Sequence, residues 1–519
     1  MSEIGWEWLA KRYKINTVFP FRIRSKIGTI KRVDASDGFK SQEFPPSFRP
    51  EDSFSGHMTF TLKYEGIHLE FLSRLFLLPE VKEQLIAWIS NEPTGSYARR
   101  AAFFYEWFNE DELPADRVAG NYVDAVDETD YFTSANPLLN RRWHVRNNLP
   151  GSLEFCPMIQ LSEVVKAADS YNCTEKLTEL ETKFGADIIQ RSAVWLTVKE
   201  SRASFAIEHE EDQSDRIRRF ASVMESRCGN AGDPLSGQAL VDLQSDILGD
   251  SATNYGLRKS PVFVGHSGGY TEFVDYIAPH FTNIDSLLDG LRYSLKSSVG
   301  KSSIIRATIA SFGFVYIHPM ADGNGRISRF LVNDILRRDN AIPAPFILPI
   351  SATITNTGAA RAGYDKSLDY FSRPLMHKCS GKYRFGKDKE YADGIISNFE
   401  FSGYDEMLPA WRYPDLTMHA EYLFGVIKLT IEKEMNDEAQ YMRNVHQARS
   451  DIKEILEAPN PSIDRIIRSV KGNNWVISTK LIEEFPVLTN EKIAAAIAGA
   501  VQRAFKPEEI KTNDVEDQF

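Results

Sequence analysis

The sequence predicts a mostly α-helical protein with one β-hairpin. Apolar residues recur at helical spacing from residue 59 to about residue 108, and again over most of residues 161–338. Residues 260–281, SPVFVGHSGGYTEFVDYIAPHF, differ because they place β-type residues on both sides of Gly268-Gly269. That arrangement is typical of a hairpin with a glycine turn.

Length and composition indicate a folded protein with several domains. A chain of 519 residues predicts roughly two to four domains. Its 42% hydrophobic and 26% charged residues exclude disorder over most of the chain. We find no apolar run long enough for a membrane span, no secretory signal at the start and no CxxC pair among the four cysteines. We therefore expect a soluble cytoplasmic protein without a zinc site or a disulfide framework.

The net charge of −11 disfavours non-specific nucleic-acid binding by the whole chain. Residues 1–32 are an exception, with eight basic side chains against two acidic ones. This stretch is either a surface for DNA or a partner or, as we favour for so short a segment, a solvated face.

Punctuation by proline, glycine and serine divides the chain into three predicted parts. Residues 36–57 are typical of a loop, and residues 110–160 are irregular. We expect an N-terminal accessory domain of unknown role at 1–150, a central domain at 161–375 and a helical C-terminal extension at 376–519. The short helices of the extension fit a winged-helix-like unit or a plain helical extension, and we favour the latter.

A polar loop between two apolar helices is the strongest candidate for chemistry. Residues 304–317 are apolar enough for a buried helix, and residues 327–336 repeat apolar side chains at helical spacing. The loop between them contains the segment HPMADGNGR, from His318 to Arg326. Because packed helices fix both of its ends, the loop is suited to a preorganised site.

The end of this loop is suited to binding an anion. Gly323 and Gly325 flank Asn324, so the backbone can turn sharply and approach a ligand closely. The following helix offers unpaired N–H groups and a positive dipole end, which favour a phosphate. Arg326 and Arg329 lie three residues apart and can add bidentate contacts.

The same loop contains one residue of a type that binds metal ions and one residue of a type that acts as a base. Asp322 is a hard oxygen ligand suited to Mg²⁺, and His318 is a plausible base for a hydroxyl that attacks phosphorus. An EF-hand is rejected because its first and last ligands would be Met320 and Leu331. A Walker A loop is rejected because no Gly-Lys-Ser/Thr follows.

HPMADGNGRISR resembles the signature of Fic-domain proteins, His-x-Phe-x-(Asp/Glu)-Gly-Asn-Gly-Arg-x-x-Arg. Every fixed position but one is present; Met320 replaces the Phe that anchors the loop, and Met can fill such a pocket. The segment YGLRKSPVFVGHSGGYTEFVDYIAPHF is similar to the family's Arg-containing lead and β-hairpin flap. The resemblance covers about residues 161–375 and implies a mostly helical core with a flap.

The resemblance also implies an activity, the transfer of AMP from ATP to a Ser, Thr or Tyr hydroxyl of a target protein. By position, His318 is the base, and Asp322 holds Mg²⁺ between the α- and β-phosphates. The target would add to the flap as an extra strand. Tyr364 either lines the adenine pocket or is an ordinary packing aromatic. The implied phosphate ligands are Gly323, Asn324 and Gly325 as the cradle and Arg326 and Arg329 on the outer phosphates.

Residues 204–209, SFAIEH, resemble the inhibitory helix of many Fic proteins, (Ser/Thr)-x-x-x-Glu-(Gly/Asn). Ser204 and Glu208 match the pattern, and His209 departs from it. A glutamate that reached the phosphate site would pair with Arg329 and compete with the γ-phosphate for it. We therefore predict that Glu208 is autoinhibitory; the alternative is that Glu208 is one of several acids on a solvated helix.

Three classes of function remain at this point. The first is an adenylyltransferase, or a Fic-type enzyme that transfers UMP or phosphate or removes AMP. The second is a DNA-binding regulator or toxin–antitoxin component. The third, a scaffold with a dead site, is disfavoured by the intact His, Asp and two Arg residues. The sequence leaves homodimer formation and DNA binding open and gives no sign of a membrane partner.

Overall fold

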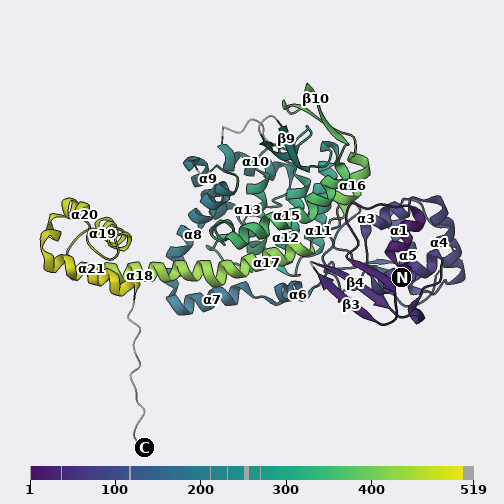
Figure 1. The fold of residues 1–519 in the computed structure, drawn as a ribbon, viewed down its shortest axis with the longest axis horizontal. Coiled ribbons are helices and arrows are strands. Elements are labelled where there is room, and N and C mark those ends of the chain that lie inside the picture. Colours follow the sequence, from purple (N-terminus) through teal and green to yellow (C-terminus); the bar gives the residue numbers. More distant parts are fainter. Residues whose placement is uncertain are drawn as a thin grey trace, which may run out of the picture. The chain divides into compact units, whose positions relative to one another are not determined.

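The computed structural model describes residues 2–36, 38–115, 118–210, 212–230, 232–249, 256–268 and 271–506. It is mostly helical with small sheets, as predicted (Figure 1). Two compact units divide the chain: unit 1 comprises Met1–Asn172 and Thr197–Ile427, and unit 2 comprises Cys173–Leu196 and Lys428–Phe519. The predicted boundaries near residues 150, 160 and 375 stay predictions.

Unit 1 contains the majority of the helices, and two of them, α8 and α17, continue into unit 2. The helices are α1 (Trp6–Tyr13), α2 (Phe54–Tyr64), α3 (Leu69–Leu75), α4 (Pro79–Asn91), α5 (Ser96–Phe108), α6 (Glu163–Ser170), α8 (Ala186–Ile207), α9 (Ser214–Arg227), α10 (Gly237–Leu248), α11 (Ile284–Ser297), α12 (Ser303–Ile317), α13 (Asn324–Arg338), α14 (Ile350–Asn356), α15 (Gly358–Cys379), α16 (Tyr404–Arg412) and α17 (Thr417–Leu429).

The N-terminal part of unit 1 contains more strand than the sequence predicted. Its four-stranded sheet has the order β1-β2-β4-β3, and a second sheet has the order β5-β7-β6. The expected loop at 36–57 is therefore wrong in part, because strand β4 lies within it. Exposed residues on β3 and β4 weaken the alternation that marks a strand. The strands are β1 (Ser2–Ile4), β2 (Ile23–Ile27), β3 (Arg32–Ser36), β4 (Phe39–Phe44), β5 (Val123–Asp124), β6 (Leu138–Asn140) and β7 (Val145–Asn147).

Helices α12 and α13 pack against each other and form the base of the candidate site. Every residue of α12 except Ser303 and Val315 is buried, as its apolar sequence predicted. At the ends far from the connecting loop, Arg306 of α12 donates to Asp339 after α13 with Nε–Oδ2 at 2.6 Å. This buried ion pair ties the two helix ends together and leaves the loop at the opposite end.

The predicted hairpin is confirmed. Strands β8 (Phe263–Gly268) and β9 (Thr271–Ile277) pair antiparallel from Phe263↔Ile277 to Gly268↔Thr271. Gly269, the second glycine of the predicted turn, lies outside the described residues. Helix α15 packs against β9.

A second hairpin, not predicted, lies beside the first. Strands β10 (Tyr383–Glu390) and β11 (Ile396–Phe401) pair antiparallel, and the Phe263 ring of β8 lies 4.8 Å from the Phe399 ring. Nearly all of β10 is exposed, so its sequence carries no buried face that could reveal a strand.

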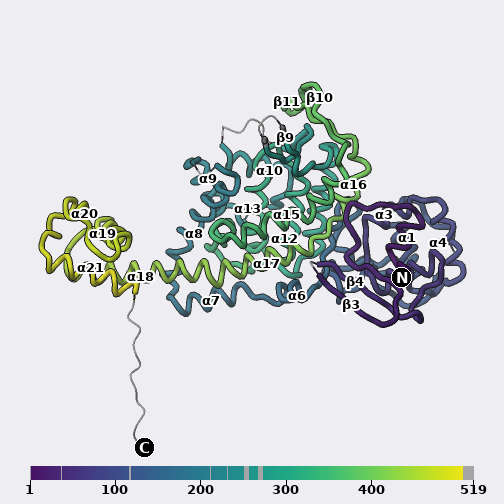
Figure 2. The backbone as a smooth tube through the Cα atoms, viewed as in Figure 1, coloured from purple at the N-terminus to yellow at the C-terminus, as the bar shows by residue number. Residues whose placement is uncertain are grey.

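Unit 2 is helical in the residues that the structure describes. Its helices are α7 (Cys173–Phe184), α18 (Asn436–Lys453), α19 (Asn460–Gly472), α20 (Thr479–Glu484) and α21 (Glu491–Phe505). Helices α18, α19 and α21 lie together (Figure 2). Most of the larger side chains of the core that they share are isoleucine and valine. Up to residue 506 this unit contains no strand. The helical extension expected at 376–519 stays a prediction, and the hairpin of β10 and β11 lies within that range.

Across the described ranges, no helix combines the length and apolarity needed to cross a bilayer.

Replacing Asp339 by Ala should lower the free energy of unfolding by about 3–5 kcal/mol, because it leaves the Arg306 guanidinium buried without its counter-charge. Urea denaturation measures the change. Asp369→Ala is the matched control, since its ion pair with Arg373 is exposed and should contribute less than about 1 kcal/mol. Equal effects of the two substitutions would contradict this account of the helix pair.

Candidate active site

The loop between α12 and α13 is shaped by its own backbone. His318 ends α12 in the left-handed region at φ 49°, and Gly323 precedes α13 at φ 88°. The Asn324 side chain accepts a hydrogen bond from the N–H of Met320 at 3.0 Å and donates to its carbonyl at 2.8 Å. Because its amide is used in this way, only the backbone N–H of Asn324 can face an anion.

Arg258, just before the flap, holds the loop from outside. Its side chain donates to the carbonyls of His318 at 2.7 Å, Ser260 at 2.9 Å and Pro279 at 2.7 Å. Its backbone N–H donates to the Pro319 carbonyl at 2.9 Å. The sequence identifies this residue only as the arginine in the segment that precedes the flap. It does not predict that Arg258 positions the loop.

His318 is partly buried and neutral near pH 7. Burial, with the positive charge of Arg258, lowers the pKa of its imidazole to about 4. Its Nδ1 lies 3.3 Å from the Val315 carbonyl. Since a carbonyl can only accept, the proton belongs on Nδ1, and Nε2 carries the free lone pair of a base.

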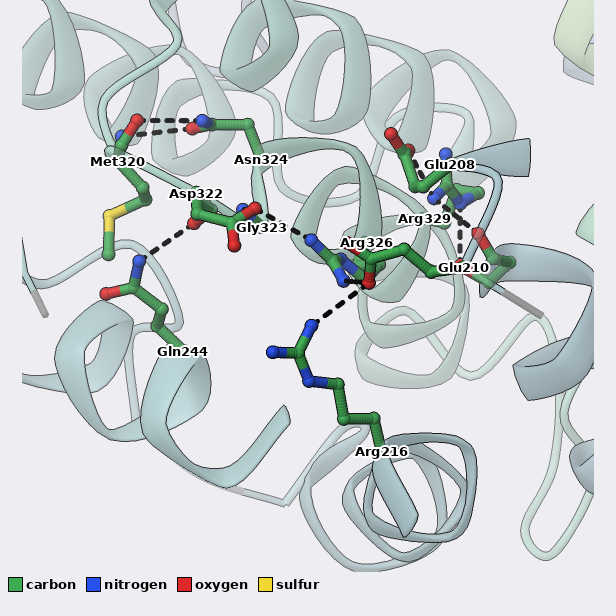
Figure 3. A network of polar contacts seen from close by, with 11 residues as sticks. Glu208, Glu210, Arg216, Gln244, Met320, Asp322, Gly323, Asn324, Arg326 and Arg329 are labelled. Carbon is green, nitrogen blue, oxygen red and sulfur yellow. Dashed lines mark hydrogen bonds and ion pairs between the residues drawn. The ribbon is translucent and has the colours of Figure 1, made fainter. Parts of the chain in front are cut away.

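The predicted pair between Glu208 and Arg329 is present (Figure 3). Glu208 Oε1 accepts from Arg329 Nη2 at 2.7 Å, and Ser204 accepts from Arg329 Nε at 2.8 Å through its hydroxyl and from Nη2 at 3.0 Å through its carbonyl. Burial raises the pKa of Glu208, but the charge of Arg329, its hydrogen bond and the charge of Arg326 together hold that pKa below its usual value. The carboxylate is therefore ionised and rests against Gly325, where a Cβ would lie 2.1 Å from Oε1.

Arg326 has acidic partners that the sequence did not reveal. Its Nη1 donates to Glu210 Oε2 at 2.6 Å and its Nη2 donates to Asp322 Oδ1 at 2.8 Å (Figure 3). The guanidinium also lies 5.1 Å from the Phe205 ring centre. Glu210 also accepts from Arg216 of α9 at 3.1 Å. The sequence did not single out Glu210, whose partner Arg326 lies 116 residues away along the chain.

A cavity of about 330 Å³ lies beside the loop. Tyr364, Leu368 and Ser372 of α15 and Val264 and Tyr276 of the flap line it opposite the loop. The remaining lining residues are Glu208, Val315, Tyr316, His318, Ala321, Asp322, Gly323, Asn324, Gly325 and Arg326. The structure thus brings together the predicted site residues except Ser204 and Arg329, which lie behind Glu208.

The polar groups of the site fit a phosphate. Arg326 and Arg329 are only 3% and 4% exposed, yet Arg326 Nε and Arg329 Nη1 have no hydrogen-bond partner in the described part of the chain. Buried donors without partners are costly. They lie at the N-terminus of α13, where the helix dipole favours an anion.

A divalent cation would depend on a bound ligand for most of its coordination. Among the described residues, no three His, Cys, Asp or Glu side chains cluster in a way that could hold a metal. The Asp322 side chain is 53% exposed and faces the cavity. A single carboxylate that shares the ion with phosphate oxygens is the arrangement Mg²⁺ commonly takes.

Comparisons with known proteins report similarity over the part of the chain that contains this loop. Residues 234–336 match the family model described as Fic/DOC family. Two curated proteins named protein adenylyltransferase fic-1 are 32% identical over 114 residues (Caenorhabditis briggsae) and 30% identical over 120 residues (Caenorhabditis elegans). The alignments cover 21% and 23% of this chain, and the chain spans 20% and 22% of those relatives.

Among solved structures, a Fic family protein from Desulfovibrio desulfuricans G20 matches with a TM-score of 0.37 and 17% identity. The match covers 63% of this chain and 94% of that one.

Replacing Asn324 by Ala should lower the free energy of unfolding by about 2 kcal/mol or more, because the Met320 N–H and carbonyl then lack partners in a buried place. Urea denaturation measures the loss. Asn230→Ala is the control, since it removes one exposed hydrogen bond from the side chain to the Ser226 carbonyl. This substitution should change the free energy of unfolding by less than about 0.5 kcal/mol. A loss no larger than that of the control would show that the loop is held in some other way.

Proposed function

We propose that this chain, whose residues 234–336 form a Fic/DOC domain, transfers AMP from ATP to a Ser, Thr or Tyr hydroxyl of a target protein. The observation that carries the proposal is the convergence of a neutral imidazole and the buried arginine Arg326 on one cavity at a helix N-terminus. An enzyme of phosphoryl-type transfer needs these parts, since positioning and charge stabilisation supply most of its rate.

The phosphates of ATP would lie along the start of α13. The backbone N–H groups of Asn324 and Gly325 would face them, and that of Gly323 would do so once it left Asp322 Oδ1, to which it donates at 2.5 Å. Arg326 and Arg329 would bind the outer phosphates. Asp322 would hold Mg²⁺, which when bound neutralises charge between the α- and β-phosphates. Tyr364 lines the far side of the cavity and would contact the adenine.

The chemical step would begin with the target hydroxyl. His318 Nε2 accepts its proton as the oxygen attacks the α-phosphorus. A new oxygen–phosphorus bond forms, the bond between the α-phosphorus and the bridging oxygen to the β-phosphate breaks, and pyrophosphate leaves. Arg258 keeps the imidazole in place through the His318 carbonyl.

The flap would present the target. Strand β8 pairs only with β9 among the described strands, so it offers an edge to an extended segment. Val264 of β8 is 43% exposed and also lines the cavity. A segment added at this edge would therefore reach the imidazole.

Glu208 would be autoinhibitory. Its carboxylate occupies Arg329 and separates that guanidinium from the cavity. A γ-phosphate would have to displace it, so ATP would bind weakly or in an unproductive pose.

UMP transfer, phosphate transfer and removal of AMP would use the same groups, and the choice of labelled nucleotide separates them.

Glu208→Gly should raise incorporation of label from α-labelled ATP into protein at least tenfold over the unsubstituted chain, in the range of typical coupling free energies. Label from γ-labelled ATP should not be incorporated, because pyrophosphate leaves. The measurement is autoradiography of a lysate incubated with the full chain, and Glu208→Gly/His318→Ala is the control that should abolish labelling. Incorporation of the γ-label would indicate that the chain transfers phosphate and not AMP.

The rate of Glu208→Gly should stay level from pH 8 down to about pH 5, because the reactive imidazole has a pKa of about 4 and is neutral over that range. Protonation removes the base, so kcat/KM should fall only as the pH approaches 4. Loss of Glu208, which favours the imidazolium, moves the fall to lower pH. A midpoint near pH 6.5 in single-turnover assays would contradict the role of buried, neutral His318.

A further inference from the structure

The segment after α8 brings two carboxylates to the loop. His209 adopts the left-handed region at φ 59°, and the N–H groups of Glu208 and Glu210 both donate to the Phe205 carbonyl, at 3.1 and 2.9 Å. This tight turn places Glu208 and Glu210 on the same side. Figure 3 shows them directed at different arginines, Glu208 at Arg329 and Glu210 at Arg326.

Two carboxylates compete with a phosphate for Arg326. Nη1 is bonded to Glu210 and Nη2 to Asp322, so a phosphate that approaches any edge of the guanidinium meets a carboxylate that already shares one of its nitrogens. Bidentate binding of a phosphate requires such an edge. The contact with Glu210 also neutralises the charge that would attract the phosphate.

We propose that Glu210 is a second inhibitory carboxylate, which withholds Arg326 from nucleotide as Glu208 withholds Arg329. This inference rests on the proposed function, because it assigns regulation to the same phosphate site. The two contacts use different arginines, so removal of Glu208 alone releases only half of the anion site.

Glu210 also connects the site to another helix. Arg216, in the first turns of α9, donates to the same Oε2 that binds Arg326. A displacement of α9 would therefore pull on Glu210 directly, through the bond from Arg216. The contact with Glu210 thus has a connection to α9 through Arg216.

The test is isothermal titration of the full chain with ATP and Mg²⁺, in a His318→Ala background that prevents consumption of the nucleotide. Glu210→Gln should lower the dissociation constant on the order of tenfold, which is typical of coupling between two sites. Combined with Glu208→Gly, it should lower the constant below that of either single substitution. The matched control is Asp212→Asn, which makes the same charge change in the same segment, and Asp212 forms no ion pair with Arg326 or Arg329.

The outcomes separate this inference from the proposed function. Tighter binding by Glu208→Gly, with Glu210→Gln no different from Asp212→Asn, overturns the second inhibitory contact alone. Failure of every variant, including the double one, to bind ATP overturns both. Glu210→Ala provides a second substitution, and thermal unfolding without nucleotide verifies that each variant is folded.

Discussion

The pair of hydrogen bonds between Asn324 and the backbone of Met320 is the constraint on which the site depends. These bonds close the turn, and two further contacts hold it from neighbouring elements. Arg258 donates to the His318 carbonyl, and Gln244 of α10 donates to the Asp322 carbonyl at 2.8 Å. Because the loop is held from within and from two sides, its backbone needs no reordering when a ligand arrives.

The buried arginines explain why the site carries its own acids. A guanidinium removed from water without a counter-charge destabilises the fold, so Arg326 and Arg329 need anionic partners whenever phosphate is absent. Glu208 and Glu210 supply those partners from one short segment. Under the proposed function, inhibition and stability would have the same origin, because a nucleotide would have to replace carboxylates that stabilise the free protein.

Sequence reasoning succeeded where local pattern determines structure. The loop, its two helices, the flap and the pairing of Glu208 with Arg329 could be predicted, because each follows from glycine placement, apolar periodicity or a family motif. Even the departure at His209 has a local explanation: its φ of 59° is a conformation that the Gly or Asn of the pattern adopts easily and that His adopts at modest cost. The contacts of Arg258 and Glu210 could not be predicted, because their partners lie far away in sequence and nothing local reports them. Strands β10 and β3 were missed since neither has a buried face.

The replacement of Phe by Met320 shows which part of the motif carries the geometry. The Met320 side chain is fully buried, so it still fills the pocket between the helices. What fixes the turn, however, is the backbone of residue 320: its N–H and carbonyl bond to Asn324, and Leu257 forms a β-bridge with it just before Arg258. Those backbone groups are the same whichever side chain follows. A flexible, adaptable side chain is therefore compatible with an ordered loop here, provided that it excludes water from the pocket.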